Sequence, residues 1–274
     1  MNSGILFIAA GMATLAASFI IWHDALNRRG TPDRQQSAHQ INALLATAIA
    51  LNIWAIHLMD SFSVNGINFT LANSVAVATL LVQGMYMIGV MRHGTRGLGL
   101  FLLPATVISL ILIPILPAAI APSWVKTDSV LETGHLLVSL LAYAVLTLAA
   151  FHAVMQIMLD RALKRKRLTI LAQSLPSLID IERHMIAQVK IATTLIAISV
   201  LSGLSWQWVE YQHFAILSHK VLLALFSLAI LVLLLIKRHR SDWPTRIVSR
   251  TVVGAYLLLM LAYFGVNLIK SWIS

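Results

Sequence analysis

Residues 135–159 read HLLVSLLAYAVLTLAAFHAVMQIML and contain no Asp, Glu, Lys or Arg. A helix rises about 1.5 Å per residue, so a run of this length exceeds the roughly 30 Å hydrocarbon thickness of a bilayer. The apolar residues surround the whole helix, whereas a helix at the surface of a soluble domain keeps one polar face. The stretch therefore predicts a transmembrane helix.

Similar stretches recur along the whole chain. Of its 274 residues, 59% are hydrophobic and 11% are charged, against roughly 45–50% and 25% in soluble proteins. These values predict an all-α, polytopic membrane protein with eight transmembrane helices in one bundle, which forms a single domain over 1–274. The expected spans lie at about 4–22, 41–59, 71–91, 98–118, 135–159, 188–208, 219–236 and 251–270.

The basic residues are concentrated in alternate connections between these spans. Segments 23–40, 92–97, 160–190 and 237–250 hold 17 of the 20 Lys and Arg residues. By the positive-inside rule these connections face the cytoplasm, and both termini face outward. The net charge of +10 is therefore interpreted as a topology signal, and we expect no nucleic-acid partner.

Several chemistries are disfavoured by what the sequence lacks. There is no cysteine, which excludes disulfides, thiolate metal sites, iron–sulfur clusters and thioether-attached haem. All ten acidic residues fall in connections or at helix ends, whereas ion- and proton-coupled transporters usually carry an ionisable group inside the bundle. No phosphate loop, HExxH helix or serine-nucleophile elbow is present. We therefore expect no catalytic activity.

Three histidines share one predicted level, near the outer boundary of the membrane. His57 lies near the end of the second span, and His135 and His219 open the fifth and seventh spans. Neutral imidazole is a good axial ligand of haem iron, and two imidazoles on opposite helices can hold a porphyrin in an apolar bundle. The pattern predicts a non-covalent haem b with His135 and His219 as ligands. The alternative is that each histidine is an interfacial, hydrogen-bonded side chain.

Other side chains near these histidines have two interpretations each. Ser139 and Tyr143 follow His135 at intervals of four, so they lie along one stripe of the helix and either orient the imidazole or pack between helices. Lys220 follows His219 and either pairs with a haem propionate or extends its charge to the membrane surface. Tyr143 and Lys220 are candidate cofactor contacts.

Four sequence segments together resemble a known family. They are GHLLVS at 134–139, the basic connection with Pro176 and Glu182, SHKVL at 218–222, and AYFG at 262–265. As a set they resemble the cytochrome c assembly family, and in particular its compact eight-helix members of the HemX and YpjD type. The resemblance covers roughly residues 40–270.

The resemblance implies a role near haem. In larger relatives that export haem, two outer histidines flank a tryptophan-rich loop that presents it, so His135 and His219 would be the axial ligands and His57 a further histidine of the group. The corresponding stretch here is short, GLSWQWVE at 203–210. By the resemblance, its tryptophans Trp206 and Trp208 are expected cofactor contacts. The resemblance thus implies haem binding without ligation of haem to an apocytochrome.

These observations predict a multi-pass protein of the bacterial inner membrane that binds or handles haem at its outer face. The expected partners are the lipid bilayer, haem, and other membrane or cytochrome-assembly proteins. Two alternatives stay open: a cofactor-free membrane scaffold or regulatory factor, and a small-solute transporter. A Soret band in the purified protein separates the first alternative from haem binding.

Overall fold

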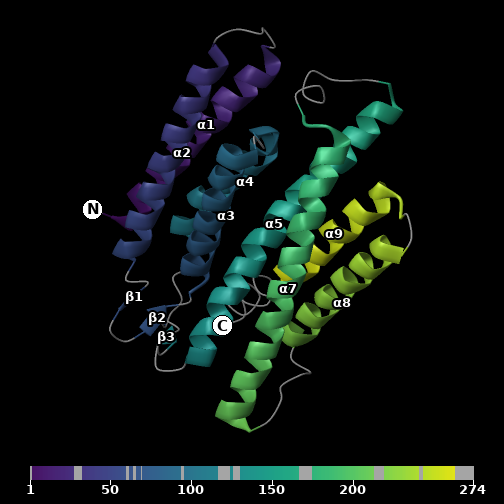
Figure 1. The fold of residues 1–274 in the computed structure, drawn as a ribbon. Coiled ribbons are helices and arrows are strands. Elements are labelled where there is room, and N and C mark those ends of the chain that lie inside the picture. Colours follow the sequence, from purple (N-terminus) through teal and green to yellow (C-terminus); the bar gives the residue numbers. More distant parts are fainter. Residues whose placement is uncertain are drawn as a thin grey trace.

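The computed structural model describes residues 2–27, 33–59, 62–63, 66–68, 70–93, 96–116, 124–125, 130–166, 175–212, 219–240 and 243–262. Within these ranges the chain forms eight α-helices (Figure 1). Their bounds are α1 Ser3–Leu26, α2 Asp33–Leu58, α3 Leu71–His93, α4 Gly99–Leu112, α5 Val130–Lys164, α7 Leu178–Tyr211, α8 His219–Arg240 and α9 Thr245–Met260.

Seven helical segments of the described chain, all except α9, are long and apolar enough to cross a membrane; the fourth is Arg96–Ile115, which joins α4 to a 3-10 turn at each end. The prediction of an all-helical, polytopic membrane protein is confirmed. Helix α9 begins at Thr245, before the predicted span at 251–270, and its described part ends near Ala262. The last residues of that predicted span lie outside the described part of the chain.

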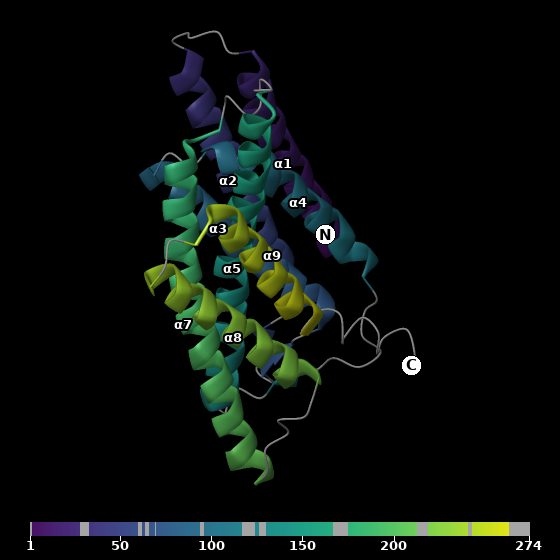
Figure 2. The same cartoon turned by 90° about the vertical axis from the view of Figure 1, so that its right-hand side faces the viewer.

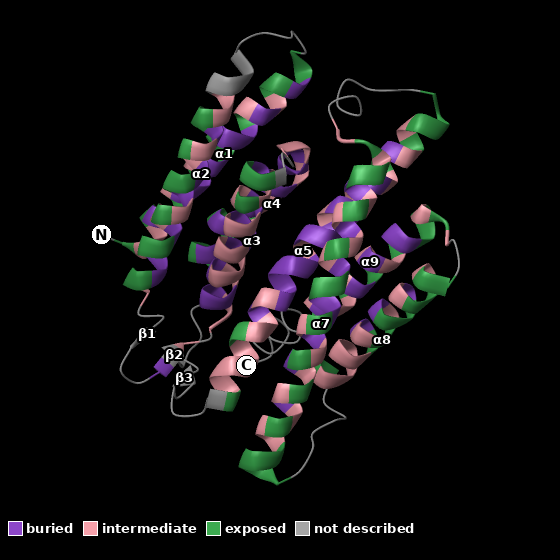
Figure 3. Ribbon diagram, viewed as in Figure 1, coloured by how far each residue is buried: buried purple, intermediate pink, exposed green. Residues whose placement is uncertain are grey.

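Helices α5 and α7 form the centre of the bundle. Figures 1 and 2 show α1 to α4 on one side of this antiparallel pair and α8 and α9 on the other. In α5, Ala144 and Leu148 belong to the apolar core shared with α1 to α4, while Leu146 and Ala149 belong to the core shared with α7, α8 and α9. The central turns of α5 are accordingly buried (Figure 3), because the two halves of the molecule pack against it.

Both central helices are longer than a membrane is thick. Helix α5 has 35 residues and α7 has 34, so each is about 50 Å long. The C-terminal end of α7 extends beyond the other helices in both views (Figures 1 and 2). This end carries the short tryptophan-containing stretch, so the fold places that stretch beside the first turns of α5.

Two smaller features shape the remaining helices. Pro104 inside α4 has no N–H for the carbonyl of Leu100, and the indole Nε1 of Trp22 donates to that carbonyl at 3.2 Å instead. At the end of the molecule where α5 begins, three short strands form an antiparallel sheet in the order β1-β2-β3. Their bounds are β1 Phe62–Ser63, β2 Gly66–Asn68 and β3 Trp124–Val125. The sequence analysis did not predict these strands.

Candidate functional site

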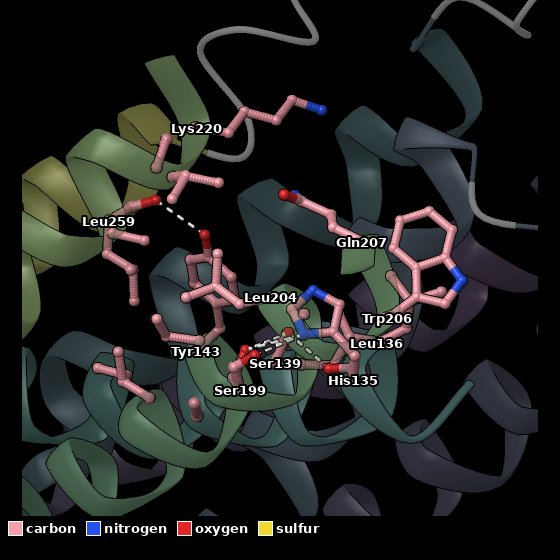
Figure 4. A pocket seen from close by; sticks show the side chains of 18 residues that line it. His135, Leu136, Ser139, Tyr143, Ser199, Leu204, Trp206, Gln207, Lys220 and Leu259 are labelled. Atoms are coloured by element: carbon pink, nitrogen blue, oxygen red, sulfur yellow. Dashed lines mark hydrogen bonds between the residues drawn. The ribbon is translucent and has the colours of Figure 1, made fainter. Parts of the chain in front are cut away.

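A pocket of about 260 Å³ lies between α5, α7, α8 and α9, near the first turns of α5 (Figure 4). Apolar side chains make up most of its lining. The polar and aromatic side chains of the lining are His135, Ser139, Tyr143, Ser199, Trp206, Gln207 and Lys220. An apolar pocket with a few placed polar groups is the usual form of a small-molecule site.

His135 is held in one orientation by helix α7. Its ring Nδ1 lies 2.7 Å from the backbone oxygen of Ser199. Because a carbonyl oxygen only accepts hydrogen bonds, Nδ1 carries a proton and donates it. In the neutral ring the second nitrogen, Nε2, therefore keeps its lone pair, and Figure 4 shows this nitrogen on the open side of the pocket. The arrangement suits Nε2 for binding a metal.

Serine hydroxyls connect α5 to α7 beside the imidazole. The Oγ of Ser139 donates to the backbone oxygen of His135 at 2.6 Å, and it lies 2.7 Å from the Oγ of Ser199. Since the Ser139 hydroxyl has one proton, the Ser199 hydroxyl donates in the second bond. These bonds fix the position of His135 along the helix pair.

Gly203 allows α7 to approach the imidazole closely. A Cβ atom at this position would lie 2.7 Å from Cε1 of His135 and 3.0 Å from Nδ1. A side chain there would collide with the ring, so the ring occupies the space that the glycine leaves. Gly203 lies one helical turn after Ser199, which places both residues on the same face of α7.

Tyr143 closes the inner side of the pocket. Its hydroxyl donates to the backbone oxygen of Leu259 at 2.9 Å, and its side chain is buried. This bond connects α5 to α9, whose residues Leu259 and Ala262 complete the lining. The contact shows that Tyr143 positions α9 beside the pocket, and Figure 4 shows its ring between His135 and Leu259.

Longer polar side chains surround the mouth of the pocket. Lys220 extends over it from the first turn of α8, and Gln207 and Trp206 stand on the opposite side, on α7 (Figure 4). The ring of Trp206 also contacts that of Tyr211 edge to face, with centroids 5.5 Å apart. The mouth thus combines a cationic group with a flat aromatic wall.

The structure brings four of the seven predicted cofactor contacts together: His135, Tyr143, Trp206 and Lys220. The other three lie outside the pocket lining. His219 is exposed at the first residue of α8, Trp208 is exposed on α7, and His57 is exposed near the end of α2. Ligation by His219 and a role for His57 stay predictions.

Several pocket residues were missing from the sequence analysis. Ser199, Gly203 and Gln207 are spaced by four along α7, and this periodicity marks a helix stripe of small and polar residues. The sequence alone indicates this stripe, but it does not indicate that the stripe packs against His135 of α5. Among the described residues, no group of three or more His, Asp and Glu side chains could hold a metal ion. The pocket therefore offers an isolated imidazole and not a multi-histidine metal centre.

Comparison with known proteins identifies the family. The family model described as cytochrome C assembly protein matches residues 37–273. The chain belongs to the cytochrome c assembly family. The resemblance seen in the segments around 134–139, 218–222 and 262–265 is thereby confirmed, and all pocket-lining residues fall within the matched range.

Individual relatives cover most of the chain. A 28.8 kDa protein of Azospirillum brasilense is 28% identical over 280 residues, which cover 99% of this chain and 98% of that protein. Inner membrane protein YpjD of Escherichia coli is also 28% identical, over 91% of each chain. Protein HemX of Brevibacillus brevis is 28% identical over 53% of each. The match to the first two proteins extends over nearly their full length.

Proposed function

We propose that this cytochrome c assembly family protein binds haem b non-covalently in the pocket between α5, α7, α8 and α9, with Nε2 of His135 as an axial ligand. The proposal rests on one observation above the others: the Ser199 carbonyl fixes the tautomer of His135 and leaves Nε2 on the pocket side. Iron-binding histidines usually donate their other nitrogen to such an acceptor.

The rest of the lining suits a porphyrin. The walls are apolar, as the macrocycle requires, and the Lys220 ammonium at the mouth suits a propionate carboxylate. The pocket volume lies slightly below the roughly 300–1,000 Å³ of sites that enclose a drug-sized ligand. A haem would therefore fill the pocket and keep one edge outside it, as expected for a protein that handles the cofactor.

When bound, haem would supply an iron that His135 and a second side chain of the protein could hold. The chain would hold the His135 ring and exclude water from the apolar part of the pocket. It would also offer the Lys220 ammonium to the propionates. His219 is our proposed second ligand, and the start of α8 must rotate to bring its exposed side chain to the pocket. The spin state of the iron tests this part of the proposal separately.

We place this activity in the bacterial inner membrane, with the pocket toward the outer face. The charge distribution of the connections and the name of the relative YpjD, an inner membrane protein, support this location. Other membrane or cytochrome-assembly proteins are the proposed partners. The short segment 203–210 lacks the extended tryptophan-rich loop, so we propose haem binding and not covalent ligation.

The experiment is a haem measurement on protein purified from haem-replete cells. The wild type is expected to show a Soret band that shifts on reduction, with about one haem per chain. His135→Ala is expected to lose most of the haem because it removes the ligand nitrogen. The matched control is His239→Ala, which removes an exposed histidine at the far end of α8 and should keep the haem.

Two results would contradict the proposal. A colourless wild-type protein would favour a cofactor-free scaffold. Unchanged haem content and an unchanged spectrum in His135→Ala would remove His135 as a ligand, provided that the variant inserts into the membrane normally.

A further inference from the structure

A short pattern occurs twice in the central helix pair, at the end opposite the pocket. Residues 152–156 of α5 read HAVMQ, and residues 184–188 of α7 read HMIAQ. Each is His-x-x-x-Gln, so the imidazole and the carboxamide lie on the same face of their helix. Because the two helices are antiparallel, the two patterns run in opposite directions.

The two patterns meet in the structure. The rings of His152 and His184 have centroids 6.0 Å apart. Gln188 lies one helical turn after His184, on the same face of α7. His152 is 2% exposed, and its Nδ1 donates to the backbone oxygen of Leu148 at 2.9 Å. In the neutral ring the lone pair is therefore on Nε2, the same tautomer that the Ser199 carbonyl gives His135.

The carboxamides of this cluster have unused hydrogen-bonding capacity. Gln156 is 1% exposed; its Oε1 accepts from the Oγ of Ser249 at 2.8 Å, while its Nε2 has no partner among the described residues. The buried Oε1 of Gln188 also makes no hydrogen bond of good geometry with the described part of the chain. Buried polar groups without partners are costly. A cation at Oε1 of Gln188 would therefore stabilise the cluster, whereas the N–H group of Gln156 needs an acceptor.

We propose that this cluster binds one divalent first-row transition-metal ion through Nε2 of His152, the imidazole of His184 and Oε1 of Gln188. Imidazole nitrogen with a carbonyl oxygen is a donor set that Zn²⁺ and Cu²⁺ accept, and the Leu148 carbonyl orients His152 as a ligand. Because the protein would supply three donor atoms, water would occupy the remaining coordination positions of the ion. His184 is half-buried and gives the ion a route into the cluster.

The proposed metal site is independent of the haem pocket. His152 follows His135 by 17 positions on one helix, which separates them by roughly 25 Å along the axis. At the same end of the bundle, Arg238 of α8 forms an ion pair with Glu182 of α7, with 2.6 Å between Nη2 and Oε1.

The test uses metal ions alone on purified, chelator-treated wild-type protein in detergent. One Zn²⁺ per chain is expected, and Co²⁺ is expected to give visible absorption bands that Zn²⁺ displaces. His152→Asn and His184→Asn are each expected to weaken Zn²⁺ binding by at least about tenfold, because each removes a ligand nitrogen. His239→Asn and His135→Ala, which alter histidines elsewhere, are expected to bind the ion normally.

A spectroscopic arm needs no variant, so it remains decisive if the histidine variants fail to fold. Electron paramagnetic resonance of the Cu²⁺-loaded wild type is expected to show coupling to two nitrogen ligands. The proposal is overturned if the wild type binds no stoichiometric ion, if the Cu²⁺ spectrum shows fewer than two nitrogens, or if folded His152→Asn binds Zn²⁺ like the wild type. The proposal is also overturned if His152→Asn loses haem and still binds Zn²⁺, because His152 would then serve the haem and not a metal ion.

Discussion

Replacing Gly203 by alanine should disturb the His135 ring without touching any polar group. The new Cβ would lie 2.7 Å from Cε1 of His135, whereas ordinary van der Waals contacts begin near 3.4 Å. The ring must therefore retreat by about 0.7 Å or α7 must move away by as much. Either displacement acts on the 2.7 Å bond from Nδ1 to the Ser199 carbonyl, because Ser199 and Gly203 lie on the same helix.

The magnitude follows from two effects. Forcing an extra carbon into a packed contact costs about 1–3 kcal/mol, and a weakened neutral hydrogen bond costs about 0.5–1.5 kcal/mol. For a metal-binding histidine, loss of the group that orients it typically lowers metal affinity 10- to 100-fold. We therefore expect Gly203→Ala to weaken haem binding by at least tenfold and to lower the thermal unfolding temperature.

The assay is titration of haem into apoprotein, followed at the Soret band, with thermal unfolding measured in parallel. Gly134→Ala is the matched control, since a Cβ there meets nothing within 4 Å although the residue adjoins His135 in sequence. Alanine also favours a helix over glycine by about 1 kcal/mol, so the control should be neutral or more stable. Equal haem affinity in Gly203→Ala and the wild type would show that the imidazole orientation does not govern binding.

Three further predictions address orientation, charge and packing. Cysteine introduced at Ser63 should react with an impermeant thiol reagent in intact cells, and cysteine at Ser241 should be protected; the opposite pattern would invert the topology. Lys220→Gln should weaken haem binding by no more than about fivefold, because an exposed ion pair contributes little. Added salt should diminish this difference between the variant and the wild type. An unchanged affinity would show that Lys220 does not contact a propionate. Tyr143→Phe should lower the free energy of unfolding by about 1 kcal/mol, measured by denaturation, since it deprives the Leu259 carbonyl of a donor; an unaltered stability would show that this bond is replaced.

The membrane helices could be predicted because they depend on local composition. A run such as 135–159 has too few polar groups to face water anywhere, so its burial in lipid or protein follows from the run alone. Helices α5 and α7 continue past the predicted spans at 135–159 and 188–208 into polar residues such as Arg161 and Glu210. Helices end where capping or a turn ends them, and not where the membrane does.

The pocket could be predicted only in part, for a different physical reason. His135 was found because its position at the start of a span is a property of one segment. Its partners Ser199 and Gly203 depend on the register of α7 against α5, which is set by packing of residues distant in sequence. A small-residue stripe indicates that some neighbour approaches closely, but it does not name that neighbour.

The start of α8 shows most clearly what a sequence leaves undetermined. His219 and Lys220 are consecutive, and consecutive residues on an α-helix point about 100° apart, so they cannot both face one narrow pocket directly. The structure turns Lys220 over the pocket and leaves His219 exposed. If His219 is the second axial ligand, the start of α8 must rotate when haem binds, and the iron should then be low-spin. Without that rotation His135 is the sole protein ligand, the iron should be high-spin, and His219→Ala should leave the spectrum unchanged.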